Sequence, residues 1–197
     1  MARIIWKKDD LVNLKIRDNL CTIGQLLVSP FMRFFDIRNT SENWESCKLD
    51  DVQELFTVLV VNQVFRELAV GKIKGKLIVP STKPLERKWI VVNNSLERLA
   101  AGGLLYFGGK LVELGEDCSP FRAKALIEDL RFPQNQEIME KYELSNMWSA
   151  DSLKERLCRY FDTGIDRDDL KFEVFPELYD DKEKLRPLTS RLPIPYR

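Results

Sequence analysis

The sequence predicts an α+β fold in which an antiparallel, curled sheet, open or closed into a small barrel, packs against several helices. Short apolar and polar alternations between turn residues dominate residues 1–37, which indicates an antiparallel meander. Apolar residues spaced three to four positions apart in the second half indicate amphipathic helices. Hydrophobic residues make up 44% of the 197-residue chain and charged residues 31%, so the chain can bury a core of its own.

Three short strands are predicted near the N-terminus. Residues 11–16 alternate apolar and polar side chains, as a strand with one buried face does. Residues 20–29 form a longer predicted strand in which Gly24 indicates a bulge or a sharp curve. Pro30 ends that strand, and residues 31–37 form the third.

The middle of the chain predicts further strands and one helix. Residues 39–46 are polar and predict a loop. The β-branched run at 56–61 predicts a strand, and Val64 and Leu68 lie on one stripe of a helix that follows it. Two more strands are predicted at 76–79 and 89–92.

Turn glycines and helical segments alternate between residues 95 and 142. Residues 95–101 predict a short helix that ends at Gly102-Gly103. Residues 104–114 predict two strands joined by Gly108-Gly109, a pair suited to a tight turn. Further helices are predicted at 123–130 and 136–142.

The clearest helix spans residues 150–162. Ser149 suits the N-cap position because its hydroxyl can accept a hydrogen bond from a backbone N–H of the first turn. Leu153, Leu157 and Phe161 recur every four positions and form an apolar stripe. Gly164 is expected to end the helix.

We expect a single α+β domain over residues 1–175, followed by a tail over 176–197 that is acidic at first and then rich in proline and arginine. No stretch approaches the roughly 20 apolar residues that span a bilayer. The first ten residues lack the apolar core of a signal peptide. These features predict a cytoplasmic protein without a membrane partner.

The chain contains no histidine, the usual general base near neutral pH and the commonest transition-metal ligand. It also lacks a phosphate-binding P-loop, a dinucleotide fingerprint and a nucleophile elbow. We therefore expect a binding protein that is not an enzyme and uses no cofactor or metal. An enzyme that relies on carboxylate or lysine chemistry stays open as an alternative.

The four cysteines are widely spaced and form no C-x-x-C pair. This spacing favours reduced thiols over a zinc site or a disulfide framework. The cysteines are Cys21, Cys47, Cys118 and Cys158.

A basic stretch over residues 72–88 supports a second function, a nucleic-acid-binding module with Trp89 as a base-stacking residue. The simpler interpretation is a strand with one solvated face. The balance of 31 Lys and Arg against 31 Asp and Glu also disfavours a general nucleic-acid binder, and no direct nucleic-acid partner is expected. The basic residues are Lys72, Lys74, Lys76, Lys83, Arg87 and Lys88.

Short motifs in a fixed order resemble the immunity protein 26 family, whose members antagonise bacterial polymorphic toxins. The resemblance covers residues 6–92 and 144–162. It departs from the family at Asp9, where glycine is usual, and at Ala150, where proline is usual. The motifs are Lys7-Lys8-Asp9-Asp10, Gly24-Gln25-Leu26-Leu27, Phe35-Asp36-Ile37, Gly71-Lys72-Ile73-Lys74-Gly75-Lys76 and Trp148-Ser149-Ala150-Asp151.

The resemblance implies a cytoplasmic immunity protein that binds and neutralises a cognate toxin domain. It further implies a nuclease-type toxin of a contact-dependent growth inhibition system or a related polymorphic toxin system. Because nucleases have basic nucleic-acid-binding faces, we hypothesise that acidic and aromatic side chains near the C-terminus contact the toxin. These residues are Asp166, Asp168, Asp169, Phe175, Tyr179, Asp180, Asp181 and Glu183.

Overall fold

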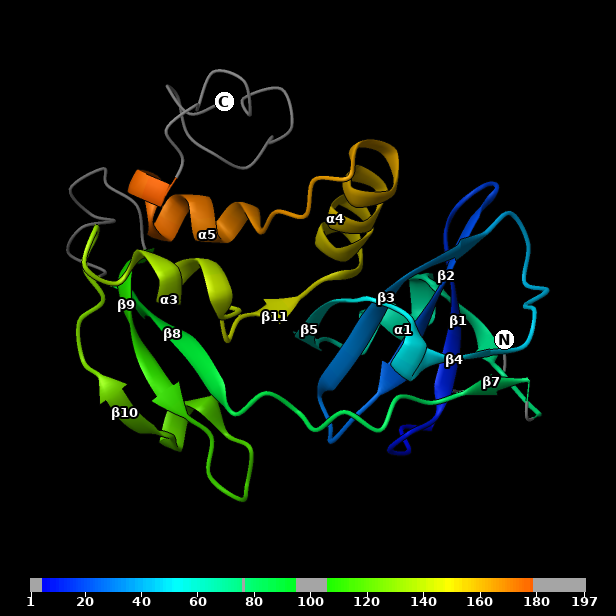
Figure 1. Cartoon of the computed structure of the whole chain (residues 1–197), viewed down its shortest axis with the longest axis horizontal. Coiled ribbons are helices and arrows are strands. Elements are labelled where there is room, and N and C mark those ends of the chain that lie inside the picture. The colour runs from blue at the N-terminus through cyan, green and yellow to red at the C-terminus, as the bar shows by residue number, and fades with distance from the viewer. Residues whose placement is uncertain (1–4, 76, 95–105, 179–197) are drawn as a thin grey trace. The chain divides into compact units, whose positions relative to one another are not determined.

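The computed structural model describes residues 5–75, 77–94 and 106–178 (Figure 1). Its contacts divide the chain into two compact units. Unit 1 consists of Met1–Leu85 and Met147–Asp166, and unit 2 of Glu86–Asn146 and Arg167–Arg197. Each unit has a hydrophobic core of its own. The domain predicted over 1–175 therefore contains two units. The mixed α+β class with a curled sheet is confirmed.

Unit 1 is built on a curled six-stranded sheet (Figure 1). Every neighbouring pair of strands is antiparallel except the first, which is parallel. The strand order is β11 (Met147–Trp148), β5 (Glu54–Val60), β3 (Phe31–Asn39), β2 (Leu20–Leu26), β1 (Leu11–Arg17) and β6 (Ala69–Lys72).

The first three strands form the predicted meander. The register shifts between Thr22 and Gly24, where the bulge was expected. A Cβ atom on Gly24 would lie 2.9 Å from Met32 Sδ, so glycine lets the two strands approach closely. β2 ends earlier than predicted because the chain turns back before Pro30: the Phe31 N–H donates to the Val28 carbonyl over 2.9 Å.

One face of this sheet packs against helices, and we call it the helix-covered face. The longest described helix is α4 (Ala150–Thr163), and α1 (Gln63–Glu67) contacts it. Ser149 Oγ accepts a hydrogen bond from the Ser152 N–H over 3.2 Å, and Gly164 ends α4 with φ +74°, as predicted. The apolar stripe of α4 is buried against strand residues that include Val12, Leu14, Ile16, Phe34 and Val58.

The opposite face carries only short segments, and we call it the loop-covered face. Leu11, Ile23 and Phe35 alternate onto it from the three meander strands. They are buried by Leu49 and Ile78. The covering segments are β4 (Cys47–Lys48), the 3₁₀ turn η1 (Leu49–Asp51) and β7 (Ile78–Val79), where β4 and β7 pair in parallel.

A buried polar cluster occupies one end of the loop-covered face. Arg33 on β3 is 1% exposed and donates to the carbonyl groups of Lys83 (2.9 Å) and Pro84 (2.8 Å). Its guanidinium also lies 3.2 Å from a carboxylate oxygen of Glu54. Gln25 holds Ser81 through two hydrogen bonds of 2.8 and 2.9 Å. Residues 81–84 are thus attached to the sheet by polar contacts instead of apolar packing.

The described part of unit 2 contains a three-stranded antiparallel sheet with two short α-helices. Its buried core includes Ile90, Leu111, Met139, Leu144 and Leu170. The elements are β8 (Lys88–Asn94), β9 (Tyr106–Glu113), η2 (Pro120–Arg122), β10 (Lys124–Ile127), α3 (Gln136–Lys141), α5 (Asp169–Val174) and η3 (Pro176–Leu178).

Two predictions for unit 2 are wrong. Gly108-Gly109 does not join two strands, because β9 runs through it. A Cβ atom on Gly109 would lie 2.9 Å from the Val91 carbonyl oxygen, so close strand packing explains this glycine. Residues 123–130 contain β10 instead of a helix, since alternate side chains there are half-buried against β9. The helix predicted at 136–142 is present, whereas the one at 95–101 and its Gly102-Gly103 end lie outside the described residues.

Candidate functional site

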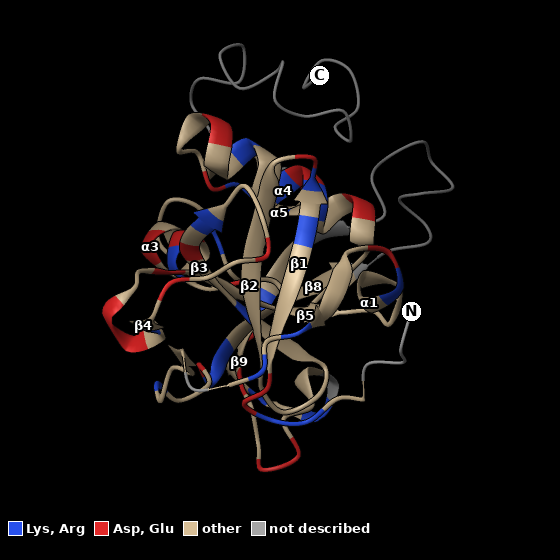
Figure 2. Cartoon of the chain, turned by 90° about the vertical axis from the view of Figure 1, so that its right-hand side faces the viewer, with Lys and Arg blue, Asp and Glu red and all other residues tan. Residues whose placement is uncertain are grey.

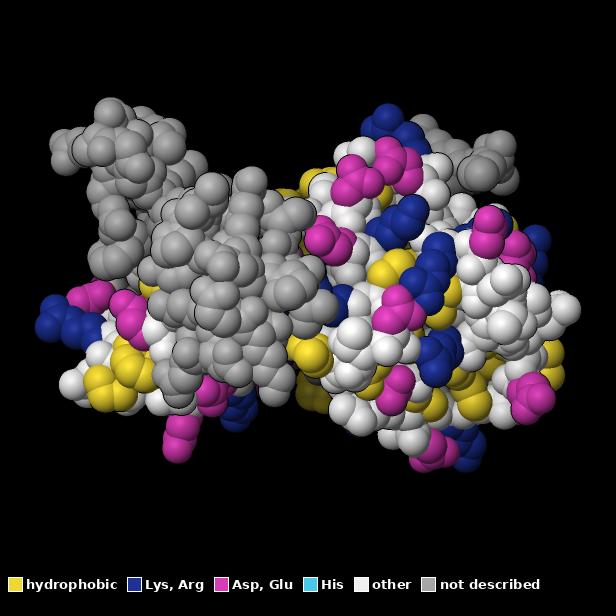
Figure 3. All heavy atoms as spheres, turned by 90° about the horizontal axis from the view of Figure 1, so that it is seen from above, with side chains coloured by type: hydrophobic (Ala, Val, Ile, Leu, Met, Phe, Trp, Pro, Cys, Tyr) yellow, Lys and Arg dark blue, Asp and Glu magenta, His cyan; other side chains and the backbone are white. Residues whose placement is uncertain are grey.

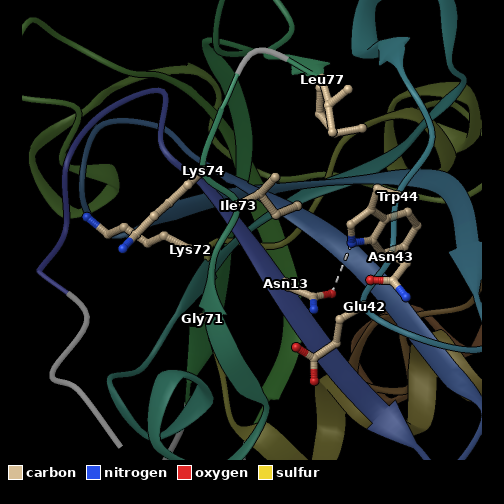
Figure 4. Close-up of a pocket in the computed structure, with 10 residues that line it drawn as sticks. Asn13, Glu42, Asn43, Trp44, Gly71, Lys72, Ile73, Lys74 and Leu77 are labelled. Atoms are coloured by element: carbon tan, nitrogen blue, oxygen red, sulfur yellow. Dashed lines mark hydrogen bonds between the residues drawn. The ribbon is translucent and has the colours of Figure 1, made fainter.

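The loop-covered face carries an open groove of about 320 Å³ (Figure 4). It lies at the end of this face away from the Arg33 cluster, beside the edge strand β6. We call it the Trp44 groove. Its lining residues are Asn13, Glu42, Asn43, Trp44, Gly71, Lys72, Ile73, Lys74, Leu77 and Ile78.

The floor of the Trp44 groove comes from two paired strands. Asn13 on β1 faces Gly71 on β6, so both residues lie on the same face of the sheet. A Cβ atom on Gly71 would meet no atom within 4 Å. The missing side chain at this position therefore leaves the groove open above the edge strand.

The wall of the groove is an aromatic side chain held by a structured loop. Asn39 anchors the loop, since its amide accepts from the Thr40 N–H over 2.7 Å and donates to the Asn43 carbonyl over 2.5 Å. The Trp44 indole N–H donates to Asn13 Oδ1 over 3.3 Å. Trp44 and Ile73 are half-buried and extend the core of the loop-covered face to the surface.

The lysines and the glutamate that line the groove lie on different sides of it. Lys72 and Lys74 extend away from Trp44 in Figure 4, and the Lys72 ammonium is paired with Asp10. Glu42 lies on the side of Asn13 and Asn43 and is exposed. Among the described residues Glu42 has no ion-pair partner.

Glu42 also acts on a neighbouring thiol. Burial raises the pKa of Cys21 above its usual value, and the negative charge of Glu42 raises it further. The groove thus carries one carboxylate without an ion-pair partner among the described residues, together with side-chain amides, an indole and apolar side chains. Leu77 adds an apolar rim and is 58% exposed. Such a surface can hold an amphipathic side chain of another molecule.

The structure changes the interpretation of the predicted acidic contact residues. Asp166 is exposed, but both of its carboxylate oxygens accept from Arg156, over 2.6 and 2.9 Å. The Arg156 guanidinium also lies 3.8 Å from the centre of the Phe56 ring. Asp166 therefore compensates a buried cation of unit 1.

Three further predicted contact residues, Asp168, Asp169 and Phe175, are buried and have partners within unit 2. Asp168 accepts from the Leu170 N–H over 2.9 Å and forms the N-cap of α5. Asp169 accepts from Arg167 over 2.9 Å. Phe175 is 3% exposed and belongs to the core. The other four predicted residues, Tyr179, Asp180, Asp181 and Glu183, lie outside the described residues.

The residues of the basic stretch do not form the expected stacking surface. Trp89 is 1% exposed, and its indole N–H donates to the Glu86 carbonyl over 2.8 Å. A buried ring cannot stack on a base. Lys72 is already paired, and Lys76 lies outside the described residues.

The Trp44 groove was not predicted from the sequence. Its residues come from β1, the 40–46 loop and the segment from β6 to β7, which are distant along the chain. The one available signal was a tryptophan in an otherwise polar loop, since a large aromatic side chain seldom lies in such a loop without a packing or binding role.

All four cysteines lie among the described residues, and none forms a disulfide, in agreement with the prediction of reduced thiols. In the described parts of the chain no three acidic or cysteine side chains group together in a way that could hold a metal ion. Likewise, no helix in those parts has the length and apolar character to span a bilayer.

Comparison with known proteins gives one match. Neither the curated proteins nor the solved structures contain a match to this chain. Residues 1–180 match a family described as a domain of unknown function, DUF8309. Because the match spans both units of the chain, the protein belongs to the DUF8309 family.

Proposed function

We propose that the protein is an immunity protein that binds a cognate bacterial toxin domain and neutralises it without turning over a substrate. The sequence motifs that resemble the immunity protein 26 family support this function. The proposed setting is the cytoplasm of a bacterium with a contact-dependent growth inhibition system or a related polymorphic toxin system. The proposed toxin is of the nuclease type.

The observation that carries the proposal is the Trp44 groove. Binding energy at protein interfaces concentrates in a few residues, and tryptophan is strongly enriched among them. Trp44 is held in place by the Asn13 hydrogen bond, so its side chain loses little conformational freedom on binding. Half-buried Ile73 and exposed Leu77 add apolar area around it.

This surface replaces the C-terminal acidic residues as the proposed contact. Asp168, Asp169 and Phe175 are committed to the interior of unit 2, and Asp166 to Arg156. The groove residues belong to unit 1 and have exposed or half-buried side chains, apart from Asn13 and Ile78. Inhibition would then consist of stoichiometric occupation of a toxin surface.

The nucleic-acid-binding alternative loses support from the same structure. Its stacking residue, Trp89, is buried. In unit 1, basic and acidic positions lie next to one another along the loops in Figure 2 and on the face seen in Figure 3. Several of them pair locally, as Lys15 does with Asp18 over 2.8 Å. Nucleic-acid binding usually requires a continuous basic surface.

The proposal is tested with the toxin domain encoded by the open reading frame immediately upstream. Co-expression of the tagged full-length chain with that domain should give a one-to-one complex and restore growth of cells that produce the toxin. Growth arrest that persists together with two separately eluting proteins would contradict the proposed function. A gel shift over a range of salt concentrations provides the test of the alternative, because phosphate contacts weaken steeply with added salt.

A further inference from the structure

We propose that the Trp44 groove receives an arginine side chain of the partner, with the guanidinium against Trp44 and the carboxylate of Glu42. This inference rests on the proposed function and adds the chemistry of the contact. Such a contact would supply the ion-pair partner that Glu42 lacks among the described residues.

The polar atoms on the Trp44 side of the groove favour a donor over an acceptor. Glu42 supplies carboxylate oxygens, which only accept hydrogen bonds, whereas the side-chain amides of Asn13 and Asn43 each supply a carbonyl oxygen and an NH2 group. Asn13 Oδ1 accepts one hydrogen bond from Trp44 and retains a second lone pair. A guanidinium carries five N–H donors and no acceptor, which matches this set.

The two lysines that line the groove do not oppose a bound cation strongly. The ammonium of Lys72 is neutralised by Asp10, and the side chains of Lys72 and Lys74 extend away from Trp44 (Figure 4). Lys15, whose ammonium interacts with the charge of Glu42, is paired with Asp18 over 2.8 Å. An anionic group on the Trp44 side would face the Glu42 carboxylate. The arrangement therefore selects a cation.

Arginine fits the groove better than lysine. The guanidinium is planar and weakly hydrated, so it stacks on an indole ring at a smaller desolvation cost than an ammonium. The volume of about 320 Å³ lies at the small end of ligand pockets and accommodates one long side chain. A basic toxin surface offers such side chains, so the chemistry agrees with a nuclease-type partner.

The first experiment measures binding of a small probe to the full-length chain. An acetylated and amidated Gly-Arg-Gly peptide is titrated to millimolar concentration, and the matched peptide contains citrulline, which is neutral but similar in shape. The indole N–H resonance of Trp44, assigned with a Trp44→Phe variant, should shift with the arginine peptide only. Equal shifts with both peptides, or no shift with either, would overturn the inference.

Two charge variants in the loop over residues 40–46 show whether the Glu42 carboxylate itself binds the guanidinium. Glu42→Gln should weaken binding of the arginine peptide about fivefold or more, because a charge-assisted hydrogen bond is lost. Glu45→Gln makes the same charge change at an exposed position that does not line the groove, and it should leave binding unchanged. An equal effect of both variants would indicate general charge attraction and would contradict the proposal.

The toxin complex separates this inference from the proposed function. Gly71→Val adds a branched side chain to the floor of the groove, and its Cβ atom meets no atom within 4 Å. This variant should fold normally and bind the toxin domain at least tenfold more weakly. A complex with unchanged affinity would reject the groove and retain the immunity function. Peptide binding without any toxin complex would retain the groove and reject the immunity function.

Discussion

The two faces of the six-stranded sheet in unit 1 are stabilised in different ways. The helix-covered face is closed by continuous apolar packing between α4 and alternate residues of the strands. The loop-covered face has a small apolar centre, a buried polar cluster around Arg33 at one end and the Trp44 groove at the other. One face therefore provides a rigid support, and the other presents side chains to solvent.

The difference between the faces follows from what covers them. A helix with a stripe of large apolar residues excludes water along its whole length. Short segments such as β4 and β7 cannot exclude water in this way. Polar contacts hold residues 81–84 in place. Binding residues are commonly found on loops carried by a rigid scaffold, and the Trp44 groove follows this rule.

The largest expected effect is on the helix-covered face. Leu157→Ala removes a fully buried side chain of α4 and should lower the free energy of unfolding by about 3 kcal/mol, because it leaves a cavity. Val79→Ala, at a 43% exposed position of the loop-covered face, should change it by less than about 0.5 kcal/mol. Urea unfolding of both variants measures the contrast, and similar losses would show that the two faces are equally packed.

A smaller loss is expected at the polar end of the loop-covered face. Arg33→Met leaves the Lys83 and Pro84 carbonyls and Glu54 without their partner and should cost about 2 kcal/mol. Exchange of the backbone amides of residues 81–83 should become faster in particular. Lys83→Met serves as the control, since its side chain is exposed and only its carbonyl group is used. Unchanged exchange in Arg33→Met would contradict a holding role for this arginine.

Two glycines, one on each face of the sheet, allow a comparison of the space available for an added side chain. Gly24→Ala on the helix-covered face brings a Cβ atom to 2.9 Å from Met32 Sδ and should cost about 1 kcal/mol after Met32 adjusts. Gly71→Ala on the loop-covered face meets open space and should be neutral or slightly stabilising, because glycine weakens a strand. The melting temperatures of the two variants measure this difference. Equal losses of stability in both variants would contradict an open groove floor.

The smallest effect is a pH dependence at the edge of the Arg33 cluster. Hydrogen bonds from the Ser81 hydroxyl and from the Thr82 hydroxyl and N–H lower the pKa of Asp50 from 3.8 to about 2. The ionised form is favoured in the folded state, so its stabilisation is complete above the ordinary pKa and is lost as the pH falls to about 2. Asp50→Asn should therefore be less stable than wild type at neutral pH and should approach it at low pH.

The matched control for Asp50 is its exposed neighbour. Asp51→Asn makes the same change of charge without removing the hydrogen bonds to Ser81 and Thr82. Its melting temperature, measured between about pH 5 and pH 2, should run parallel to that of wild type. Parallel curves for Asp50→Asn as well would show that the Asp50 contacts do not contribute to folding.

Local patterns in the sequence determined the regular elements of unit 1. Apolar alternation predicted β1, because one buried face imposes a period of two on a strand. Ser149 and Gly164 marked the ends of α4, since cap geometry depends only on neighbouring residues. Gly24 indicated the bulge in β2, where the register with β3 shifts.

Only the tertiary structure decided features that join distant parts of the chain. Gly109 was read as a turn residue, yet its role depends on the approach of Val91 from another strand. Asp168 and Asp169 were predicted to contact a toxin, whereas a short helix and Arg167 place them inside unit 2. The Trp44 groove requires Asn13, Trp44 and Gly71 to meet. Sequence patterns report the local period and the caps of each element, whereas burial and partnership arise only when separate elements pack together.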